Sequence, residues 1–451
     1  MSAFDNVIGY QKVKEELRQI IDIFKNPDLY KEMGAKLPHG VLLYGDPGMG
    51  KTLLATSLIE EIGVKSFAVT NSKEINAVKA DIVEAFDNAS KETPSIVFFD
   101  DLDKFSPSEG RNVDDPVFVA IQSCIDKVKD KEILVIATVN RIEKLPDSLK
   151  RNGRFDRKLH IGNPGQKDAE KIVEFYLRKR KVDPNANYDD IAKMISYTSC
   201  ADLDKIVNES AILATYKRKK CVETSDIVDA YLKENYGVSD SIIRGEDDKK
   251  SIALHEAGHA VVAEALKKGS VGLISTRTYS GFTKLWSTLR RRPQCILLSL
   301  GGKVACELYD KGRVASGCSS DLESAVSLIE SGLSSNATLG VSHLPGINGT
   351  NYSSDVFKMK LESAIHDELE RYLFLTRDIL IKNKDFLFAL RDELLAKNTL
   401  LHSDVARIRD RYELVPCPGY TSLPGEENPE DGPWEMDGSS YPPEDEGEEG
   451  Y

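Results

Sequence analysis

Features that would assign the chain to a membrane or to the secreted class are missing from the sequence. The longest charge-free apolar stretch of note lies near residues 295–302, far below the roughly 20 residues that a membrane-spanning helix needs. The N-terminus has neither the basic nor the apolar region of a signal peptide. The 7 cysteines are odd in number and form no C-x-x-C motif, which favours reduced thiols. We therefore expect a soluble, cytoplasmic protein without a membrane span.

A surface rich in Lys and Arg is also missing. The net charge is -13, but residues 416–451 contain eleven Asp or Glu and no Lys or Arg, so the rest of the chain carries only about -2. No basic face stands out, and we expect no binding to nucleic acid. The segment 415–451 is rich in Pro, Gly and acid, and we predict a disordered tail. It either only solvates the protein or docks an adaptor around Trp434 or Tyr451.

The length of 451 residues is too great for one core and suggests several domains. In residues 1–162, short apolar runs typical of buried strands alternate with amphipathic helical patterns. The expected strands are 41–44, 66–70, 96–99 and 133–137. Because strands that alternate with helices form parallel sheets covered by those helices, we predict an α/β subdomain here.

Helical patterns dominate the rest of the chain. Residues 163–238 contain no convincing strand and predict a small helical subdomain that follows the α/β part as a lid. The polar residues 239–250 are typical of a linker. Residues 251–414 begin and end with helical patterns, and we expect a short antiparallel sheet within 271–285.

The sequence G-D-P-G-M-G-K-T fits the P-loop motif G-x-x-x-x-G-K-[ST] between an expected strand and an expected helix, as the motif requires. Glycines let backbone N–H groups surround phosphates, and the helix N-terminus adds positive potential. Lys51 would reach the outer phosphates, and Thr52 would bind Mg²⁺. The residues expected to hold ATP here are Gly45, Asp46, Pro47, Gly48, Met49, Gly50, Lys51, Thr52 and Leu53.

Polar residues at the ends of later strands complete the predicted ATP site. Asp100 would hold Mg²⁺, and Asp101 would orient the attacking water. The second position is usually Glu in such ATPases, and the shorter Asp101 predicts slow turnover because a displacement of about 1 Å can reduce the rate about 10²-fold. Asn140 resembles the polar sensor that contacts nucleotide. Arg151 and Arg154 resemble arginine fingers, which act on a neighbouring subunit and therefore require a ring.

The sequence His255-Glu256-Ala257-Gly258-His259 predicts a zinc site. Residues at i and i+4 share one face of a helix, so both imidazoles can bind one ion, and Glu256 lies beside them as a general base for water. The flanking residues are apolar, as expected for a buried helix. A third ligand must come from elsewhere, and spacing does not choose among Glu264, Glu307 and Asp321.

With these motifs in order, residues 4–414 resemble the FtsH-type AAA proteases. The resemblance includes F-D-N-V-I-G at 4–9, the P-loop, G-R-F-D-R at 153–157 and the H-E-A-G-H motif. It also includes L-G-G at 300–302 and S-G-C-S-S-D at 316–321. The resemblance implies a multidomain fold, in which an α/β P-loop AAA+ ATPase with a helical lid precedes a mostly α-helical zinc peptidase.

This resemblance also implies roles for individual residues. Asp321 becomes the third zinc ligand, and Ile8 and Gly9 line the adenine pocket. The family assembles as a hexamer whose ATPase ring threads protein into a peptidase ring. The strand at 281–285 would be the edge on which substrate lies as an added strand. The implied cofactors are Zn²⁺, ATP and Mg²⁺.

The sequence departs from the family in several places. The N-terminal transmembrane helices of the family have no counterpart, and Cys200 stands where Gly is usual. The family carries an aromatic residue in its pore loop, whereas residues 71–80 contain none and offer only Ile75 and Val78 as apolar candidates. Cys318, three residues before Asp321, is expected to be a packing residue.

We therefore expect a hexameric, ATP-dependent zinc metalloprotease that acts on protein substrates. Two alternatives stay open. In one, an ATP-dependent remodelling module keeps a vestigial peptidase, although the intact zinc motif speaks against it. In the other, the ATPase only builds and regulates a peptidase for unfolded chains, which the altered pore loop favours.

Overall fold

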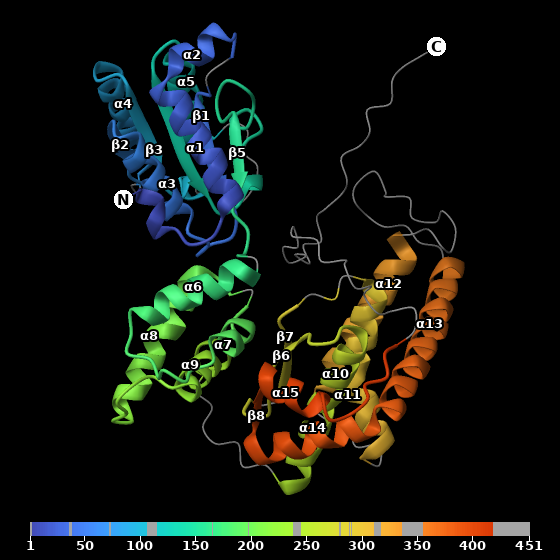
Figure 1. Ribbon diagram of the computed structural model, residues 1–451. Coiled ribbons are helices and arrows are strands. Elements are labelled where there is room, and N and C mark those ends of the chain that lie inside the picture. The colour runs from blue at the N-terminus through green and yellow to red at the C-terminus, as the bar shows by residue number, and fades with distance from the viewer. Residues whose placement is uncertain are drawn as a thin grey trace.

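The structure is a computed structural model that describes residues 2–417 apart from a set of short gaps. These gaps are 36–37, 72–73, 106–114, 165, 197, 238–244, 279–280, 288, 290, 311–316 and 336–354. The predicted disordered tail therefore lies almost wholly outside the described residues. Figure 1 shows an α/β part in blue to teal, a helical part in green and a mostly helical part in yellow to red.

The α/β part has a five-stranded parallel sheet with strand order β2-β3-β4-β1-β5. Alternate side chains of the three central strands, β3, β4 and β1, enter two separate cores, because successive residues of a strand point to opposite faces. In β4, for example, Val135 and Ala137 pack on one face, and Leu134 and Ile136 pack on the other. The strands are β1 (Gly40–Tyr44), β2 (Lys65–Val69), β3 (Ser95–Phe99), β4 (Ile133–Val139) and β5 (Arg157–His160).

Helices cover both faces of this sheet (Figure 1). One face packs against α4 (Ile75–Lys91) and α5 (Pro116–Lys127). The other packs against α1 (Gln11–Lys25) and α3 (Lys51–Ile62), with the short α2 (Pro27–Glu32) following α1. The four strands expected from the sequence are confirmed to within two residues. The fifth strand, β5, was missed because its sequence R-K-L-H has only one apolar residue.

Four helices form the lid, which has its own apolar core. They are α6 (Gln166–Arg178), α7 (Tyr188–Met194), α8 (Cys200–Tyr216) and α9 (Thr224–Tyr236). The core of the lid extends across the chain into the following part, because it contains the buried Leu273 and contacts Phe282 and Leu401. The lid is therefore packed against the C-terminal part and not only tethered to it.

Helix α10 (Glu246–Leu266) runs through the centre of the C-terminal part and is buried from Ser251 onward except at His259. It packs against α11 (Arg292–Tyr309) and α14 (Lys384–Lys397). Residues 246–250 were expected in a linker but form the first turns of α10. Their polarity reflects exposure, and the acids Glu246, Asp247 and Asp248 stabilise the helix N-terminus through its dipole.

A three-stranded antiparallel sheet with order β7-β6-β8 lies beside these helices. Strands β6 (Val271–Ser275) and β7 (Phe282–Leu285) confirm the predicted hairpin. Strand β8 (Thr399–Leu401) comes from more than a hundred residues later and could not be foreseen from a local pattern. The remaining helices are α12 (Cys318–Ser335), α13 (Asp355–Lys382) and α15 (His402–Arg409).

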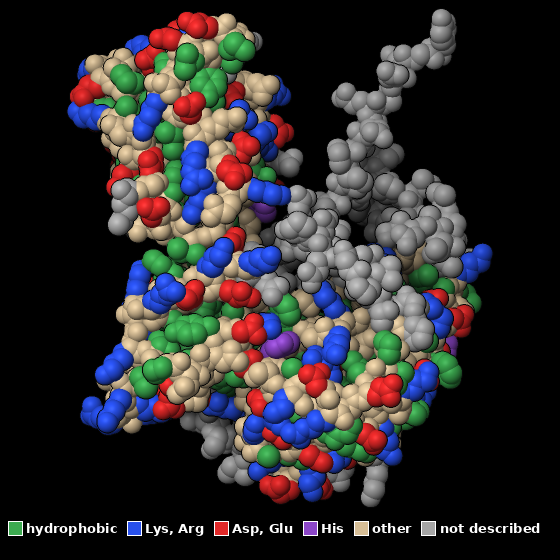
Figure 2. All heavy atoms as spheres, in the orientation of Figure 1, with side chains coloured by type: hydrophobic (Ala, Val, Ile, Leu, Met, Phe, Trp, Pro, Cys, Tyr) green, Lys and Arg blue, Asp and Glu red, His purple; other side chains and the backbone are tan. Residues whose placement is uncertain are grey.

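The described surface gives two further observations. No helix in the described ranges combines the length and the apolar composition that crossing a bilayer requires. On the face drawn in Figure 2, Lys and Arg side chains lie among Asp and Glu side chains over all three parts.

A buried ion pair fixes the turn between α10 and β6. Glu264, whose side chain is 1% exposed, accepts from Arg409 Nη1 at 2.8 Å, where Arg409 is 10% exposed. Its two oxygens also accept from the backbone N–H groups of Gly269 (2.7 Å) and Val271 (3.0 Å). This arrangement joins α15 to the centre of the fold, because a carboxylate of α10 accepts both from the turn before β6 and from Arg409 at the end of α15.

We expect Arg409→Met to destabilise the C-terminal part by about 3–5 kcal/mol, because it leaves the Glu264 charge buried without its ionic partner. Arg407→Met is the matched control, since the pair of Arg407 with Glu393 lies at the surface, where solvent screens it and its loss should have little effect on stability. The measurement is denaturant unfolding followed by Trp286 fluorescence in a Trp434→Phe background, because the Trp286 indole donates to Gly269 O in the same turn. Equal losses in the two variants would contradict this assignment.

Candidate functional site

Three side chains from two helices converge at one point of the C-terminal part. His255 and His259 extend from one face of α10, one helical turn apart, and Asp321 lies in the first turn of α12. The atoms His255 Nε2, His259 Nε2 and Asp321 Oδ2 form a triangle with sides of 3.0, 3.1 and 3.1 Å. Three ligands of one tetrahedral zinc, each roughly 2.0–2.2 Å from the ion, would be about 3.4 Å apart. The triangle therefore fits a zinc ion with little adjustment.

Glycines allow the ligand helix to lie close to its neighbour α11. A Cβ atom on Gly258 would collide with the backbone oxygen of Gly301, and one on Gly302 would lie 2.5 Å from the His255 ring. The L-G-G sequence noted above thus brings α11 against the metal ligands. From this helix, Leu298 O lies 2.7 Å from His259 Nδ1, which leaves Nε2 of that ring for the metal.

Cys318 lies beside the Nδ1 atom of His255, as Leu298 O lies beside the Nδ1 atom of His259. Its sulfur lies 3.6 Å from His255 Nδ1, on the side of the ring opposite to the triangle. Cys318 is buried and packs against Cys306. The thiol therefore contacts the His255 ring but is not one of the three groups of the triangle. This agrees with the expected packing role.

Glu256 is buried beside the triangle and does not belong to it. Burial raises the pKa of Glu256 to about 7, which suits a general base that works near neutral pH. The hydroxyl of Thr283 in β7 donates to Glu256 Oε2 at 2.8 Å. Gly281, with φ +78°, lies so close that a Cβ atom there would approach Glu256 Oε1 to 2.8 Å. The sequence singled out this strand but not Thr283, because nothing in the local pattern shows which residue faces the base.

Among the three carboxylates considered for the third ligand, only Asp321 reaches the histidines. Glu264 is held in the turn described above, and Glu307 forms an ion pair with Lys303 one turn away on α11. Spacing alone could not make this choice, because Asp321 lies 62 residues from His259 along the chain, and only the family resemblance pointed to it.

A second site is a cavity of about 420 Å³ between the α/β part and the lid. Most of the residues predicted to hold nucleotide line it, whereas Gly9, Gly45, Asp46 and Asp100 are not among the lining residues. The predicted residues along the cavity are Ile8, Pro47, Gly48, Met49, Gly50, Lys51, Thr52, Leu53, Asp101 and Asn140. The lid contributes Ile172, Phe175, Tyr176 and Cys200, which sequence motifs could not identify except for Cys200.

The P-loop has the geometry that phosphate binding requires. Gly48 and Gly50 have φ of +81° and +85°, values that favour glycine, and Gly50 is the N-cap of α3. Lys51 Nζ donates to the backbone oxygens of Gly45 (2.7 Å) and Asp46 (2.6 Å). Thr52 Oγ1 donates to Asp100 Oδ1 at 2.8 Å, so the two predicted Mg²⁺ ligands already lie together.

Each oxygen of the Asp101 carboxylate accepts a hydrogen bond from a neighbouring side chain. It has φ +52°, and Asn140 Nδ2 donates to its Oδ1 at 2.9 Å. Lys104 Nζ donates to its Oδ2 at 2.7 Å, and this hydrogen bond raises the pKa of Lys104. Lys104 lines the cavity and was missed, because it lies outside the motifs. The predicted sensor and the predicted water-orienting acid are therefore in direct contact.

The two candidate arginine fingers differ in their surroundings. Arg154 donates to both oxygens of Asp126, at 2.8 and 3.3 Å, and this contact is the main cause of the low pKa of Asp126, about 2. Arg151 is exposed and has no ion-pair partner among the described residues. Neither lines the cavity of its own chain, as expected for residues that act on a neighbour.

The structure corrects the interpretation of the segment 71–80. Residues 72–73 lie outside the described residues, and α4 begins at Ile75. Val78 is 1% exposed and packs in the core, because it lies on the inner face of that helix. It cannot grip a substrate, whereas Ile75 is 41% exposed.

Comparison with known proteins agrees with this arrangement of two sites. The model of the ATPase family associated with various cellular activities (AAA) matches residues 41–163, and the model of peptidase family M41 matches residues 242–408. ATP-dependent zinc metalloprotease FtsH 2 of Sphaerobacter thermophilus is 31% identical over 425 residues, which are 88% of this chain and 64% of that protein. FtsH of Mycoplasma pneumoniae is 29% identical over 448 residues, 92% of this chain and 63% of that protein.

A third relative, FtsH 2 of Symbiobacterium thermophilum, is 31% identical over 437 residues, 90% of this chain and 74% of that protein. The chain thus spans 53–64% of the length of the first three relatives that it matches.

The geometry predicts the zinc content of variants. His259→Ala and Asp321→Ala should lose zinc during dialysis against a competing chelator, because each removes one corner of the triangle. Glu256→Gln and Cys318→Ala should keep one equivalent, since neither group is a ligand. Zinc is measured by atomic emission, with circular dichroism to show that each variant is folded. An Asp321→Ala protein that retains zinc as the wild type does would exclude Asp321 as a ligand.

Proposed function

Because the chain belongs to the FtsH family of ATP-dependent zinc metalloproteases, we propose that it hydrolyses ATP and cleaves peptide bonds in protein substrates. The observation that carries the proposal is the triangle of His255, His259 and Asp321 with the buried Glu256 beside it. A nucleotide cavity in the same chain supports coupling of the two reactions. Zn²⁺, ATP and Mg²⁺ are the proposed cofactors.

The proposed peptidase residues have separate roles. His255, His259 and Asp321 would hold zinc, which supplies Lewis-acid chemistry by polarising the scissile carbonyl and acidifying water. Glu256 would accept a proton from the attacking water and pass it to the leaving amine. Thr283 keeps the carboxylate of Glu256 in place, and β7 is an edge strand on which an extended substrate can add as a further strand.

The ATPase residues act within and between chains. Lys51 would contact the outer phosphates, Thr52 and Asp100 would bind Mg²⁺, and Asp101 would orient water. Arg151 and Arg154 would act on a neighbouring subunit, which is why we propose a homohexameric ring. A cytosolic location and an adaptor bound to the acidic tail stay predictions of the sequence.

A second candidate function is an ATP-regulated peptidase for unfolded chains with little unfolding power. It is favoured by the absence of an aromatic residue from segment 71–80 and by the engagement of Asp101 with Lys104. Aromatic side chains bury about 150–250 Å², more than the single exposed Ile75 can offer to a moving polypeptide.

The test uses one unfolded and one stably folded protein, each with ATP, with ADP and with a chelator. We expect zinc-dependent cleavage of the unfolded protein and loss of that cleavage in Glu256→Gln, whose ATPase activity should persist because the base is far from the nucleotide. Normal proteolysis by Glu256→Gln would overturn the proposal. Rapid ATP-dependent degradation of the folded protein would exclude the second candidate.

The arginine fingers give a further prediction. Arg151→Ala should reduce ATP hydrolysis by about 10³-fold or more while nucleotide binding persists, because a finger is worth about 10³–10⁵ in rate. Arg154→Ala should also lower activity, and it should additionally loosen the segment held by Asp126. Mixing Arg151→Ala with Lys51→Ala chains should restore some hydrolysis, since one intact interface can form. Full activity of a monomeric protein would rule out action between subunits.

A further inference from the structure

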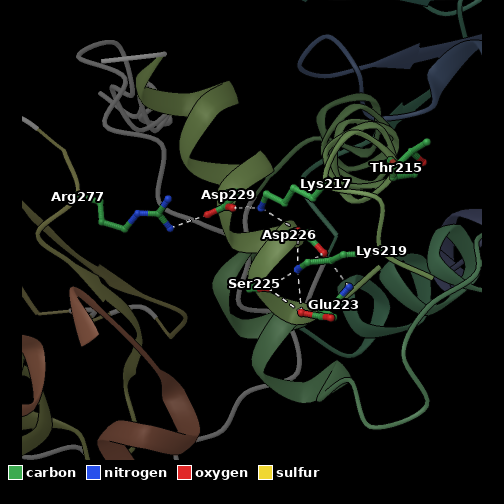
Figure 3. Close-up of polar contacts among 9 residues, drawn as sticks. Thr215, Lys217, Lys219, Glu223, Ser225, Asp226, Asp229 and Arg277 are labelled. Carbon is green, nitrogen blue, oxygen red and sulfur yellow. Dashed lines mark hydrogen bonds and ion pairs between the residues drawn. The ribbon is translucent and has the colours of Figure 1, made fainter. Parts of the chain in front are cut away.

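Helix α9 of the lid contacts the β6–β7 hairpin at three places. The first is an ion pair between Asp229 of α9 and Arg277, which follows β6, with 2.7 Å between Oδ1 and Nη1. Figure 3 shows that Asp229 is held in turn by Lys217, at 2.6 Å, and that Lys217 also contacts the buried Asp226 at 2.9 Å. The carboxylate that holds the hairpin is therefore fixed within the lid.

The other two contacts lie on β7 itself. Lys284 Nζ donates to the hydroxyl of Tyr231 at 3.0 Å and lies 4.8 Å from the centre of the same ring. The ring of Phe282 stacks on the ring of Tyr236, with 4.5 Å between centroids and 25° between planes. Both residues of β7 that flank Thr283 are thus held by α9.

Thr283 connects this strand to the chemistry. Its hydroxyl donates to the Glu256 carboxylate, while the side chains before and after it contact the lid. Successive side chains of a strand point to opposite faces, so Phe282 and Lys284 face the lid while Thr283 faces Glu256. A shift of β7 that is caused by the lid would therefore also move Thr283. The position of Glu256 therefore depends on where α9 holds β7.

The opposite end of the lid reaches the nucleotide cavity. Ala201 N donates to Gly48 O of the P-loop at 3.2 Å, and Cys200 and Ala201 line the cavity at the start of α8. Helix α8 packs along α9 within the core of the lid. The P-loop thus contacts a helix that is packed against α9.

We propose that α9 couples the two sites: nucleotide-dependent movement of the lid sets the position of β7 through Asp229, Tyr231 and Tyr236, and Thr283 thereby positions Glu256 for peptide cleavage. Arg277, Phe282 and Lys284 are positioning residues in this arrangement, because their side chains act through the contacts of the hairpin with α9. The proposal rests on the proposed function, since it concerns the control of the same peptidase by the same ATPase.

The experiment compares the cleavage of a short fluorogenic peptide in the presence of ATP and of ADP, in the full chain loaded with zinc. A short peptide needs no unfolding, so the ratio of the two rates reports coupling alone. We expect Arg277→Gln to bring this ratio about two- to fivefold closer to 1, the factor expected for a partly exposed ion pair. ATPase rate, zinc content and oligomeric state should stay at the values of the wild type.

Three further variants complete the experiment. Arg277→Lys should keep the ratio of the wild type because it keeps the charge, and Tyr236→Ala should lower the ratio by an independent contact. Lys233→Gln is the matched control on α9, since Lys233 pairs with Glu209 inside the lid. An unchanged ratio in both Arg277→Gln and Tyr236→Ala, or a ratio of 1 in an active wild type, would overturn the coupling. A wild type without zinc-dependent peptidase activity would instead overturn the proposed function.

Discussion

The close approach of α10 and α11 is the constraint on which the metal site depends. At Gly258 and Gly301 the backbones of the two helices lie too close for any side chain, so the ligand helix is buried almost to its full length. This burial explains three properties together: the fixed orientation of His259 by Leu298 O, the burial of the Glu256 side chain, and the raised pKa of that carboxyl group. A larger residue at either glycine would separate the two helices. It would release the His259 ring, expose Glu256 and bring the pKa of Glu256 back toward its ordinary value.

The sequence predicted the parts of the fold in which chemistry and local pattern coincide. The P-loop, the strands before it and after it, and the helix that carries His255 and His259 are local features, and the structure has them where they were expected. Asp321 was reached only through family resemblance, because spacing leaves three carboxylates equal. Strand β8 and the contact of Thr283 with Glu256 depend on segments far apart in the chain, and no periodicity reports them.

Two errors had a common origin, which is that composition does not show the direction of a side chain. Val78 and Ile75 are equally apolar, yet one turn of α4 places the first in the core and leaves the second partly exposed. Residues 246–250 are polar because they face solvent at the start of a helix, and not because they connect domains. Lys104 was missed for a related reason. Its side chain points back toward Asp101, three residues earlier, and so lines the cavity beside the P-loop.

The packing of Leu273, Phe282 and Leu401 into the core of the lid has a consequence for how the chain can be divided. The family boundary near residue 242 separates two sequence modules, but the apolar interior crosses it. A fragment cut there would expose these side chains on one face of the β7-β6-β8 sheet, an apolar surface prone to association between copies. The backbone of Gly272 lies so close to Lys193 O of the lid that no side chain fits between them. No space is therefore left for a layer of solvent between the lid and the sheet. We therefore expect the lid and the C-terminal part to unfold together.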